Sequence, residues 1–418
     1  MKNNFIYTLE DKVPFKHICL YGAQELFAIL VATILIANIT NISIGAGFIG
    51  AGVGTLIYIL VTKGKSNVYF SNSGCYVAPV IFALSMAGGA GAFVGGVVVF
   101  AVYCLFGLIF NKISMDKLYD FLPKPLIATI TVLIGLSLIG FVPSYIGDTG
   151  NIGTCVALSV ATIIGLVMHY GKGRLKTIPF LVGIFGGYVI CVILTMTGVM
   201  DLVDFSVFSN VKLIQTPTFG WNNAWQTVGW QEVTAITMMY IPYCLAAACE
   251  VWADHQAMST VIGRDLIKEN GIGRIFIAAG LATGASSLIS GIPLASYGEG
   301  TGCTAASRVA SARVTAMTSI LLVLMGFCGP IQALMLSMPS VVFAGASIVL
   351  YPLIAIAGFK MLINDKLDLD NSKNMLLVSI PLSVGLGSIV LGGPNFSFSG
   401  TALALVVGVI LNLILKDN

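Results

Sequence analysis

Apolar stretches of about 20 residues recur along nearly the whole chain, and this feature restricts the fold more than any other. Fourteen such stretches lie between charged or turn-forming residues, and each is long enough to cross a bilayer as a helix. Of the 418 residues, 57% are hydrophobic and 9% are charged, whereas an ordinary soluble domain has roughly 25% charged residues. The sequence therefore predicts an all-α polytopic membrane protein. The net charge of +3 gives no indication of nucleic-acid binding.

The basic residues predict how the chain runs through the membrane. Lys and Arg gather on cytoplasmic connections, and with fourteen spans all of them except Lys212 fall on one side. We therefore expect a multi-pass protein of the cell membrane with both termini in the cytoplasm. The loop from Gly198 to Gln231 divides the spans into seven and seven. Because an odd number inverts the second half relative to the first, the sequence predicts two inverted seven-span repeats.

Spans three and ten are interrupted by polar residues, Gly and Pro. Span three contains the run Ser71–Gly74, and span ten contains Pro293 and the run Gly298–Gly302. A half-helix that begins inside the membrane leaves its first N–H groups unpaired and its positive end exposed. Interrupted segments at matching positions of two repeats therefore indicate a binding site near the middle of the membrane. The alternative is that the glycines only allow tight helix packing.

Four acidic residues lie inside predicted spans: Glu25, Glu250, Asp254 and Glu299. A charge in lipid costs at least about 2.5 kcal/mol, and no Lys or Arg lies inside a span to compensate. We therefore expect these side chains to face a water-filled cavity and some of them to carry a proton. Glu250 and Asp254 are four residues apart, on one face of a helix, which makes the pair a candidate for proton uptake. The alternative is that they only bond to neighbouring Ser, Thr or backbone groups.

Several stretches, in order along the chain, resemble the nucleobase and ascorbate transporter family (the xanthine/uracil permease family), and within it the bacterial uracil permease branch. They are GAQELFAILVAT, TLIYILVTKGK, CEVWADHQAMSTVIGRDL, SYGEGTGCTAASR and SIVLYPLIAIAGFKMLI. The resemblance implies short strands and half-helices in spans three and ten, and a homodimer. It also implies a core domain made of residues 14–110 and 230–327, and a gate domain made of residues 121–199 and 338–415.

The resemblance also implies site residues. Glu250 and Glu299 match the two glutamates that bind substrate in the family. The other positions expected to line the pocket are Ala32, Gly74, Gly298 and Tyr351, and the span-ten motif is met at Glu299, Gly302 and Arg308.

The chain departs from the family pattern at several positions. Gly300 replaces an Asn of the span-ten motif, and Ser307 replaces a Thr. Glu25 replaces a usual His, and Gly74 stands where the uracil branch has a bulky aromatic residue. Asp254 occupies the position of a His in uracil permeases and matches the Asp common in purine carriers. These departures leave the identity of the base open.

The expected function is the import of a nucleobase, preferably uracil, by proton symport, with Asp254, Glu250 and Glu25 as the proton-coupling acids. A purine or xanthine symporter coupled to protons or sodium is the alternative, and an anion transporter of the same fold is a more distant one. An enzyme is not expected, nor is a cofactor or a metal site. Tyr351 or Tyr76 is a candidate for stacking on the base, and His255 is expected at a span end, in contact with solvent.

Overall fold

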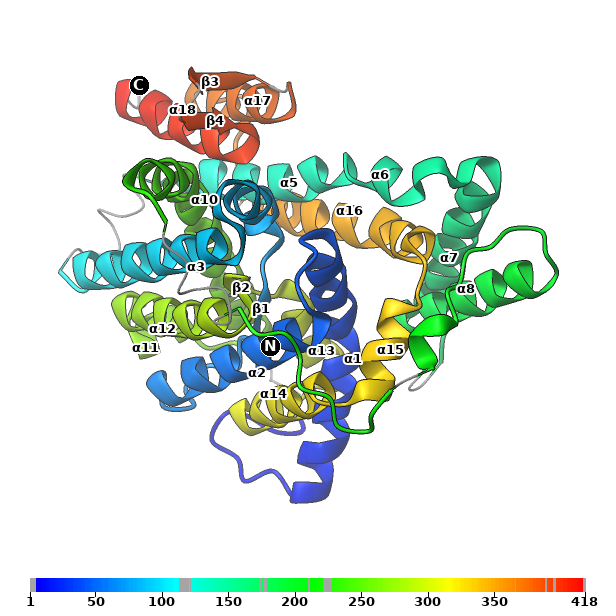
Figure 1. Cartoon of the computed structure of the whole chain (residues 1–418). Helices are drawn as coiled ribbons and strands as arrows, with labels where there is room; N and C mark the ends of the chain where they lie inside the picture. The colour runs from blue at the N-terminus through cyan, green and yellow to red at the C-terminus, as the bar shows by residue number, and fades with distance from the viewer. Residues whose placement is uncertain are drawn as a thin grey trace.

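The protein is mostly helical in the computed structural model shown in Figure 1. The structure describes residues 5–112, 120, 122–172, 175, 179–209, 211–220, 228–364, 366–387, 389–393 and 396–415; residue 121, the expected start of the gate domain, lies outside them. Within these ranges six helices are long and apolar enough to cross a membrane, and four shorter apolar helices accompany them.

A first group of helices combines the start of the chain with its third quarter. The helices are α1 (Phe15–Ile39), α2 (Ile44–Val61), α3 (Val77–Phe110), α10 (Trp230–Ile262), α12 (Ile272–Ser290), α13 (Gly298–Ser307) and α14 (Ala312–Gly326). In Figure 1, α3, α12, α2 and α14 lie one below another, and neighbours in this stack are in contact. Glycine permits the close approach of α2 to α12, because a Cβ on Gly54 would lie 2.7 Å from the carbonyl oxygen of Ala282.

A second group combines the second quarter of the chain with its last quarter. The helices are α5 (Lys124–Ile139), α6 (Val142–Ile146), α7 (Gly150–Tyr170), α8 (Pro179–Met196), α16 (Ser340–Asn364), α17 (Ser372–Leu386) and α18 (Gly400–Ile414). Helix α16 packs against α5 and α7, and α17 packs against α5 and α18. In Figure 1, α5 and α16 run side by side along one edge of the first group.

Two short strands lie at the centre of the first group. Strand β1 (Phe70–Asn72) pairs antiparallel with β2 (Leu294–Ser296), with Ser71 opposite Ala295. The pair is buried, so its outer backbone groups need partners other than water. Thr55 supplies two of these bonds: its Oγ1 donates to the Phe70 carbonyl at 2.5 Å and accepts from the Phe70 N–H at 3.2 Å. The short strands expected in spans three and ten are therefore present.

Helices begin directly after both strands. The 3-10 turn η1 (Gly74–Tyr76) leads from β1 into α3, and α13 begins two residues after β2. The backbone leaves helical geometry at Ala87 and Gly88, so α3 consists of two helical parts joined at a kink. These two parts correspond to spans three and four of the sequence prediction.

The structure contains several short elements that the sequence did not predict. Helix α17 ends at Leu386, and a hairpin of β3 (Val390–Gly393) and β4 (Phe396–Ser399) follows it. The other unpredicted elements are α11 (Leu266–Asn270), α15 (Gly329–Leu336), η2 (Gly147–Thr149) and η4 (Ser206–Phe208), together with α6. Each is shorter than three turns, so hydrophobic periodicity over spans gives no signal for it.

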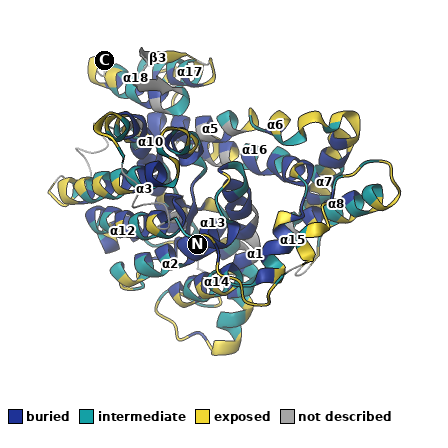
Figure 2. Ribbon diagram, viewed as in Figure 1, coloured by how far each residue is buried: buried dark blue, intermediate teal, exposed yellow. Residues whose placement is uncertain are grey.

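Large apolar side chains are exposed on the outward faces of several helices. Leu105 and Leu108 on α3, Leu158 on α7, and Val189 and Ile193 on α8 are each more than half exposed. Figure 2 shows exposed residues on the outer helices, whereas buried residues gather around β1, β2 and α13. An exposed apolar surface of this extent is typical of contact with lipid.

Candidate functional site

A cavity of about 310 Å³ lies between the two helix groups. Its first wall comes from α1, η1, α10 and α13, and its second wall comes from α5, α8 and α16. The volume is at the lower end of the range for small-molecule sites, roughly 300–1,000 Å³. All six residues predicted to contact substrate line it, together with the predicted Asp254 and Gly302: they are Ala32, Gly74, Glu250, Gly298, Glu299 and Tyr351.

Helix α10 supplies two carboxyl groups, and each one contacts a different broken segment. Glu250 Oε2 accepts a hydrogen bond from the thiol of Cys75, which follows β1, at 3.2 Å. Asp254 Oδ2 accepts a hydrogen bond from the hydroxyl of Ser296, the last residue of β2, at 2.6 Å. The spacing of four residues brings both carboxyl groups to one face of the helix, as the sequence predicts. Cys75 and Ser296 were not predicted as site residues.

The first turn of α13 supplies the third carboxyl group. Tyr297 is the N-cap residue, its side chain forms no capping bond, and it lines the cavity, so the positive end of the helix lies at the cavity wall. Gly298 brings the helix start close to Asp254, because a Cβ at this position would lie 3.3 Å from Asp254 Oδ1 and would press on the carboxyl group. Glu299 follows and lines the cavity. The cavity therefore combines hydrogen-bond acceptors with a helix end that donates.

The second wall of the cavity is apolar and aromatic. Tyr351 on α16 is buried and its hydroxyl lies 3.4 Å from the hydroxyl of Tyr145. Phe141, Phe180 and Thr131 also line this wall, and none of them was predicted as a site residue. An apolar residue that faces a cavity and one that faces lipid look alike in a sequence, so only the fold identifies them.

Glu25 lies apart from the other three acids. It is 4% exposed, and its Oε2 accepts a hydrogen bond from Thr318 Oγ1 at 2.7 Å. Thr315 Oγ1 lies 3.4 Å from Glu25 Oε1. Glu25 does not line the cavity between the helix groups, so the structure separates it from Glu250 and Asp254.

Of the two tyrosines considered for stacking, Tyr351 lines the cavity and Tyr76 does not, and the expected solvent contact of His255 is wrong. Tyr76 is fully buried outside the cavity, where its ring stacks on Tyr240 and its hydroxyl donates to that of Tyr103 at 3.3 Å. His255 has no exposed surface: its Nε2 lies 2.6 Å from the Tyr58 hydroxyl and its Nδ1 lies 2.6 Å from the Val251 carbonyl oxygen. His255 therefore joins α10 to α2.

Arg308 of the span-ten motif also lies outside the cavity. It ends α13 in a left-handed conformation with φ of 56°, and its side chain is exposed. Its N–H donates to the Thr304 carbonyl at 2.9 Å and its own carbonyl accepts from the Ile6 N–H at 2.8 Å. In this structure Arg308 terminates a helix and anchors the N-terminal segment.

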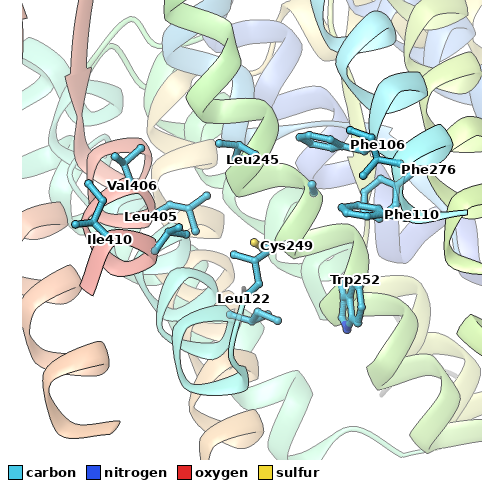
Figure 3. A pocket seen from close by; sticks show the side chains of 14 residues that line it. Phe106, Phe110, Leu122, Leu245, Cys249, Trp252, Phe276, Leu405, Val406 and Ile410 are labelled. Atoms are coloured by element: carbon cyan, nitrogen blue, oxygen red, sulfur yellow. The ribbon is translucent and has the colours of Figure 1, made fainter. Parts of the chain in front are cut away.

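A larger cavity, of about 670 Å³, contains none of the predicted residues. Its lining is apolar: Phe106, Phe110 and Phe276 lie on one side, and Leu405 and Ile410 of α18 lie on the other (Figure 3). None of its described lining residues is charged. The smaller cavity, with its three acids, is therefore the candidate site.

The comparisons with known proteins agree with the sequence resemblance. The family model Xan_ur_permease, described as Permease family, matches residues 16–392. The uracil permease of Bacillus caldolyticus is 31% identical and covers 100% of this chain and 96% of its own length. The uracil permease of Bacillus subtilis (strain 168) is 30% identical and covers 97% of this chain and 93% of its own length.

Solved transporter structures share the fold at low sequence identity. The transmembrane domain of the cyanobacterium bicarbonate transporter BicA has a TM-score of 0.61 and 16% identity, and the match covers 96% of this chain and 98% of that one. The murine anion transporter Slc26a9 in the inward-facing state has a TM-score of 0.67 and 12% identity, and the match covers 98% of this chain and 69% of that one. At these identities the likeness concerns the fold alone.

Proposed function

The chain belongs to the Permease family that its sequence matches, and from this premise we propose that it imports a nucleobase, preferably uracil, by proton symport. It is a transporter and not an enzyme. The two Bacillus permeases are named for uracil, and they match the chain over nearly its whole length.

The composition of the 310 Å³ cavity carries this proposal. Uracil presents N–H donors flanked by carbonyl acceptors, and carboxyl groups together with a helix N-terminus provide the complementary acceptors and donors. Glu250 and Glu299 would accept from the base, while the first N–H groups of α13 would donate to its carbonyl groups. Tyr351, on the opposite wall, is placed to stack on the ring.

The charge balance of the cavity supports proton coupling. Three acids line it, and none of its described lining residues is Lys or Arg. A second or third negative charge in this enclosed space is costly, so we expect a proton on at least one carboxyl group in the closed, occupied state. Asp254 is the preferred carrier, because Glu250 and Glu299 are committed to the base. A sodium ion in this cavity is the alternative.

The position of the cavity supports transport by movement of the two helix groups. We propose that the first group is the core domain, that the second is the gate domain, and that they form fourteen spans in two inverted repeats with both termini in the cytoplasm. Rocking of one group against the other would expose the cavity to each side in turn. The proposal includes a homodimer, on the basis of the family resemblance.

Specific residues favour a second candidate, a purine or xanthine symporter. Asp254 matches the Asp that is common in purine carriers of the family. Gly74 lines the cavity and leaves space where an aromatic side chain would make it narrower. An anion transporter, as in the structural relatives, is disfavoured because three carboxyl groups would repel an anion.

An uptake experiment tests the proposal. Radiolabelled uracil, xanthine, guanine, adenine and bicarbonate are offered at two pH values to cells that lack their own nucleobase permeases and express this protein. We expect uracil uptake that increases at the lower external pH. Uptake of xanthine in preference to uracil would establish the second candidate, and uptake of bicarbonate alone would overturn both.

A further inference from the structure

Glu25 lies beside a small void behind α13. The void has a volume of about 10 Å³, close to the minimum for one water molecule or a bare ion. It lies among Asn67, Thr304, Thr315 and the last turn of α13. Gly298, Glu299 and Gly302 face the substrate cavity, whereas Thr304 and Ser307 face the void. The two spaces therefore lie on different faces of one short helix.

The oxygen atoms around the void are arranged like ligands of a cation. Thr315 Oγ1 is 3.4 Å from Glu25 Oε1 and 3.3 Å from the Asn67 carbonyl oxygen, both longer than the usual 2.7–2.8 Å of a hydroxyl hydrogen bond. An ion with bonds to oxygen of about 2.4 Å places neighbouring ligands of an octahedron about 3.4 Å apart. These spacings therefore suit an ion of the size of Ca²⁺ or Na⁺.

A buried acceptor without a partner also points to a ligand. Asn67 is 1% exposed and its Nδ2 donates to Thr304 Oγ1 at 3.1 Å, but its Oδ1 has no hydrogen-bond partner. A buried acceptor left unpaired costs about 1–3 kcal/mol. A cation in the void would satisfy this oxygen.

The charges around the void favour a monovalent cation. Glu25 is the acidic residue in the lining, and none of the described lining residues is basic. The C-terminal end of α13 carries the negative end of its dipole, which favours a cation. One carboxylate balances one positive charge, whereas Ca²⁺ sites have several carboxylates.

Two departures from the family pattern meet here. A Cβ on Gly300 would lie 3.7 Å from Glu25 Oε1, so the Glu that replaces a His adjoins the Gly that replaces an Asn. Glu25 provides a negative charge, and Gly300, which has no side chain, leaves space beside the Glu25 carboxyl group.

We propose that Glu25, Asn67 and Thr315 form a sodium site behind α13, separate from the substrate cavity. The ion links α1 and α14 to the segment before β1 and stabilises the position of α13, and with it Glu299. This site does not depend on which solute the cavity binds.

The test compares thermal unfolding of the purified protein, without any base, in NaCl and in KCl of equal ionic strength. We expect Tm of the wild type to rise saturably with Na⁺ and not with K⁺. Glu25→Gln removes the charge and should abolish the rise. Gly300→Asn fills the space beside Glu25 and should weaken the apparent Na⁺ affinity at least about tenfold, which keeps the test usable if Glu25→Gln does not fold.

Asp254→Asn is the matched control, because it removes an acid from the substrate cavity. It should retain the full Na⁺-dependent rise in Tm. A wild type with the same Tm in both salts would overturn the sodium site. A Na⁺-dependent rise in Tm that persists in both Glu25→Gln and Gly300→Asn would overturn it as well. So would a rise that is lost only in Asp254→Asn, because the ion would then lie in the substrate cavity. Base uptake is measured separately, so failure of the sodium site leaves the proposed function untouched.

Discussion

The two broken segments share one geometry but offer different chemistry. In each, a three-residue strand is followed by a helix whose start lies at the cavity, and each contacts one acid of α10. The segment after β1 presents Gly74 and Cys75, and contains no acid. The segment after β2 presents Glu299 at the start of α13.

The helices that follow also differ. Helix α3 continues beyond its kink at Ala87 and Gly88 to Phe110 and packs along α10 and α12, whereas α13 ends at Ser307 and lies between the cavity and Glu25. We infer a division of roles. The first segment sets the shape of the cavity and holds Glu250, whereas the second supplies the recognition acid Glu299 and holds the coupling acid Asp254.

The largest expected effect concerns the recognition acids. Glu299→Ala or Glu250→Ala removes an acceptor for the base, and loss of a charged hydrogen-bonding partner in an enclosed site costs about 3 kcal/mol or more. We expect base binding to weaken by at least about 100-fold in calorimetry on purified protein.

Glu232→Ala provides the control, because Glu232 lies in the first turn of α10 and does not line the cavity. It should bind normally. If Glu299→Ala bound the base as well as Glu232→Ala does, the second segment would not be the recognition segment.

The next effect separates binding from energy coupling. Asp254→Asn imitates the protonated carboxyl group, so we expect proteoliposomes to exchange labelled base while accumulation driven by a pH gradient is lost. In the wild type, protonation promotes closure, so uptake should rise as external pH falls. Accumulation that follows a sodium gradient and ignores the pH gradient would refute proton symport.

A smaller effect tests the role of the first segment in shape. Gly74→Phe adds apolar volume to the cavity wall and should favour a pyrimidine over a bicyclic purine. A shift of about 1.4 kcal/mol, equivalent to two buried methylene groups, would change the ratio of uracil to xanthine affinity about tenfold. Competition uptake measures this ratio, and an unchanged ratio would show that Gly74 does not limit the size of the solute.

The smallest effect compares the two bonds to α10. Cys75→Ala and Ser296→Ala each remove one hydrogen bond, worth about 0.5–1.5 kcal/mol. We expect Cys75→Ala to weaken base binding a few-fold, since Glu250 loses its donor. Ser296→Ala should instead shift the pH dependence of uptake, since Asp254 loses its donor. If Cys75→Ala and Ser296→Ala changed base binding and the pH dependence of uptake to the same extent, the two broken segments would not have different roles.

The apolar helices and the acids of the cavity were predictable because each leaves a signal in the sequence. Lipid requires apolar runs of about 20 residues, and Pro293 and Ser71–Gly74 interrupt such runs visibly. Glu250, Asp254 and Glu299 stand out because acids are costly there. The site roles of these residues remain predictions.

Other parts of the site could not be predicted, for physical reasons. Phe141 and Phe180 reach the cavity only because α5 and α8 pack against the first group, and nothing local distinguishes them from lipid-facing residues. His255 was misplaced because its partner, Tyr58, is 197 residues away in the sequence. The separation of Glu25 from the other acids likewise depends on tertiary packing.

The most direct test of the central claim is substrate protection of Cys75, which lines the cavity and bonds to Glu250. Purified protein is alkylated with a membrane-permeant maleimide, with and without saturating uracil, and each cysteine is quantified by mass spectrometry. Cys19, near the start of α1 and outside the cavity, is the internal control. The account predicts that uracil slows modification of Cys75 and leaves Cys19 unchanged; equal rates at Cys75 with and without a bound base would contradict it.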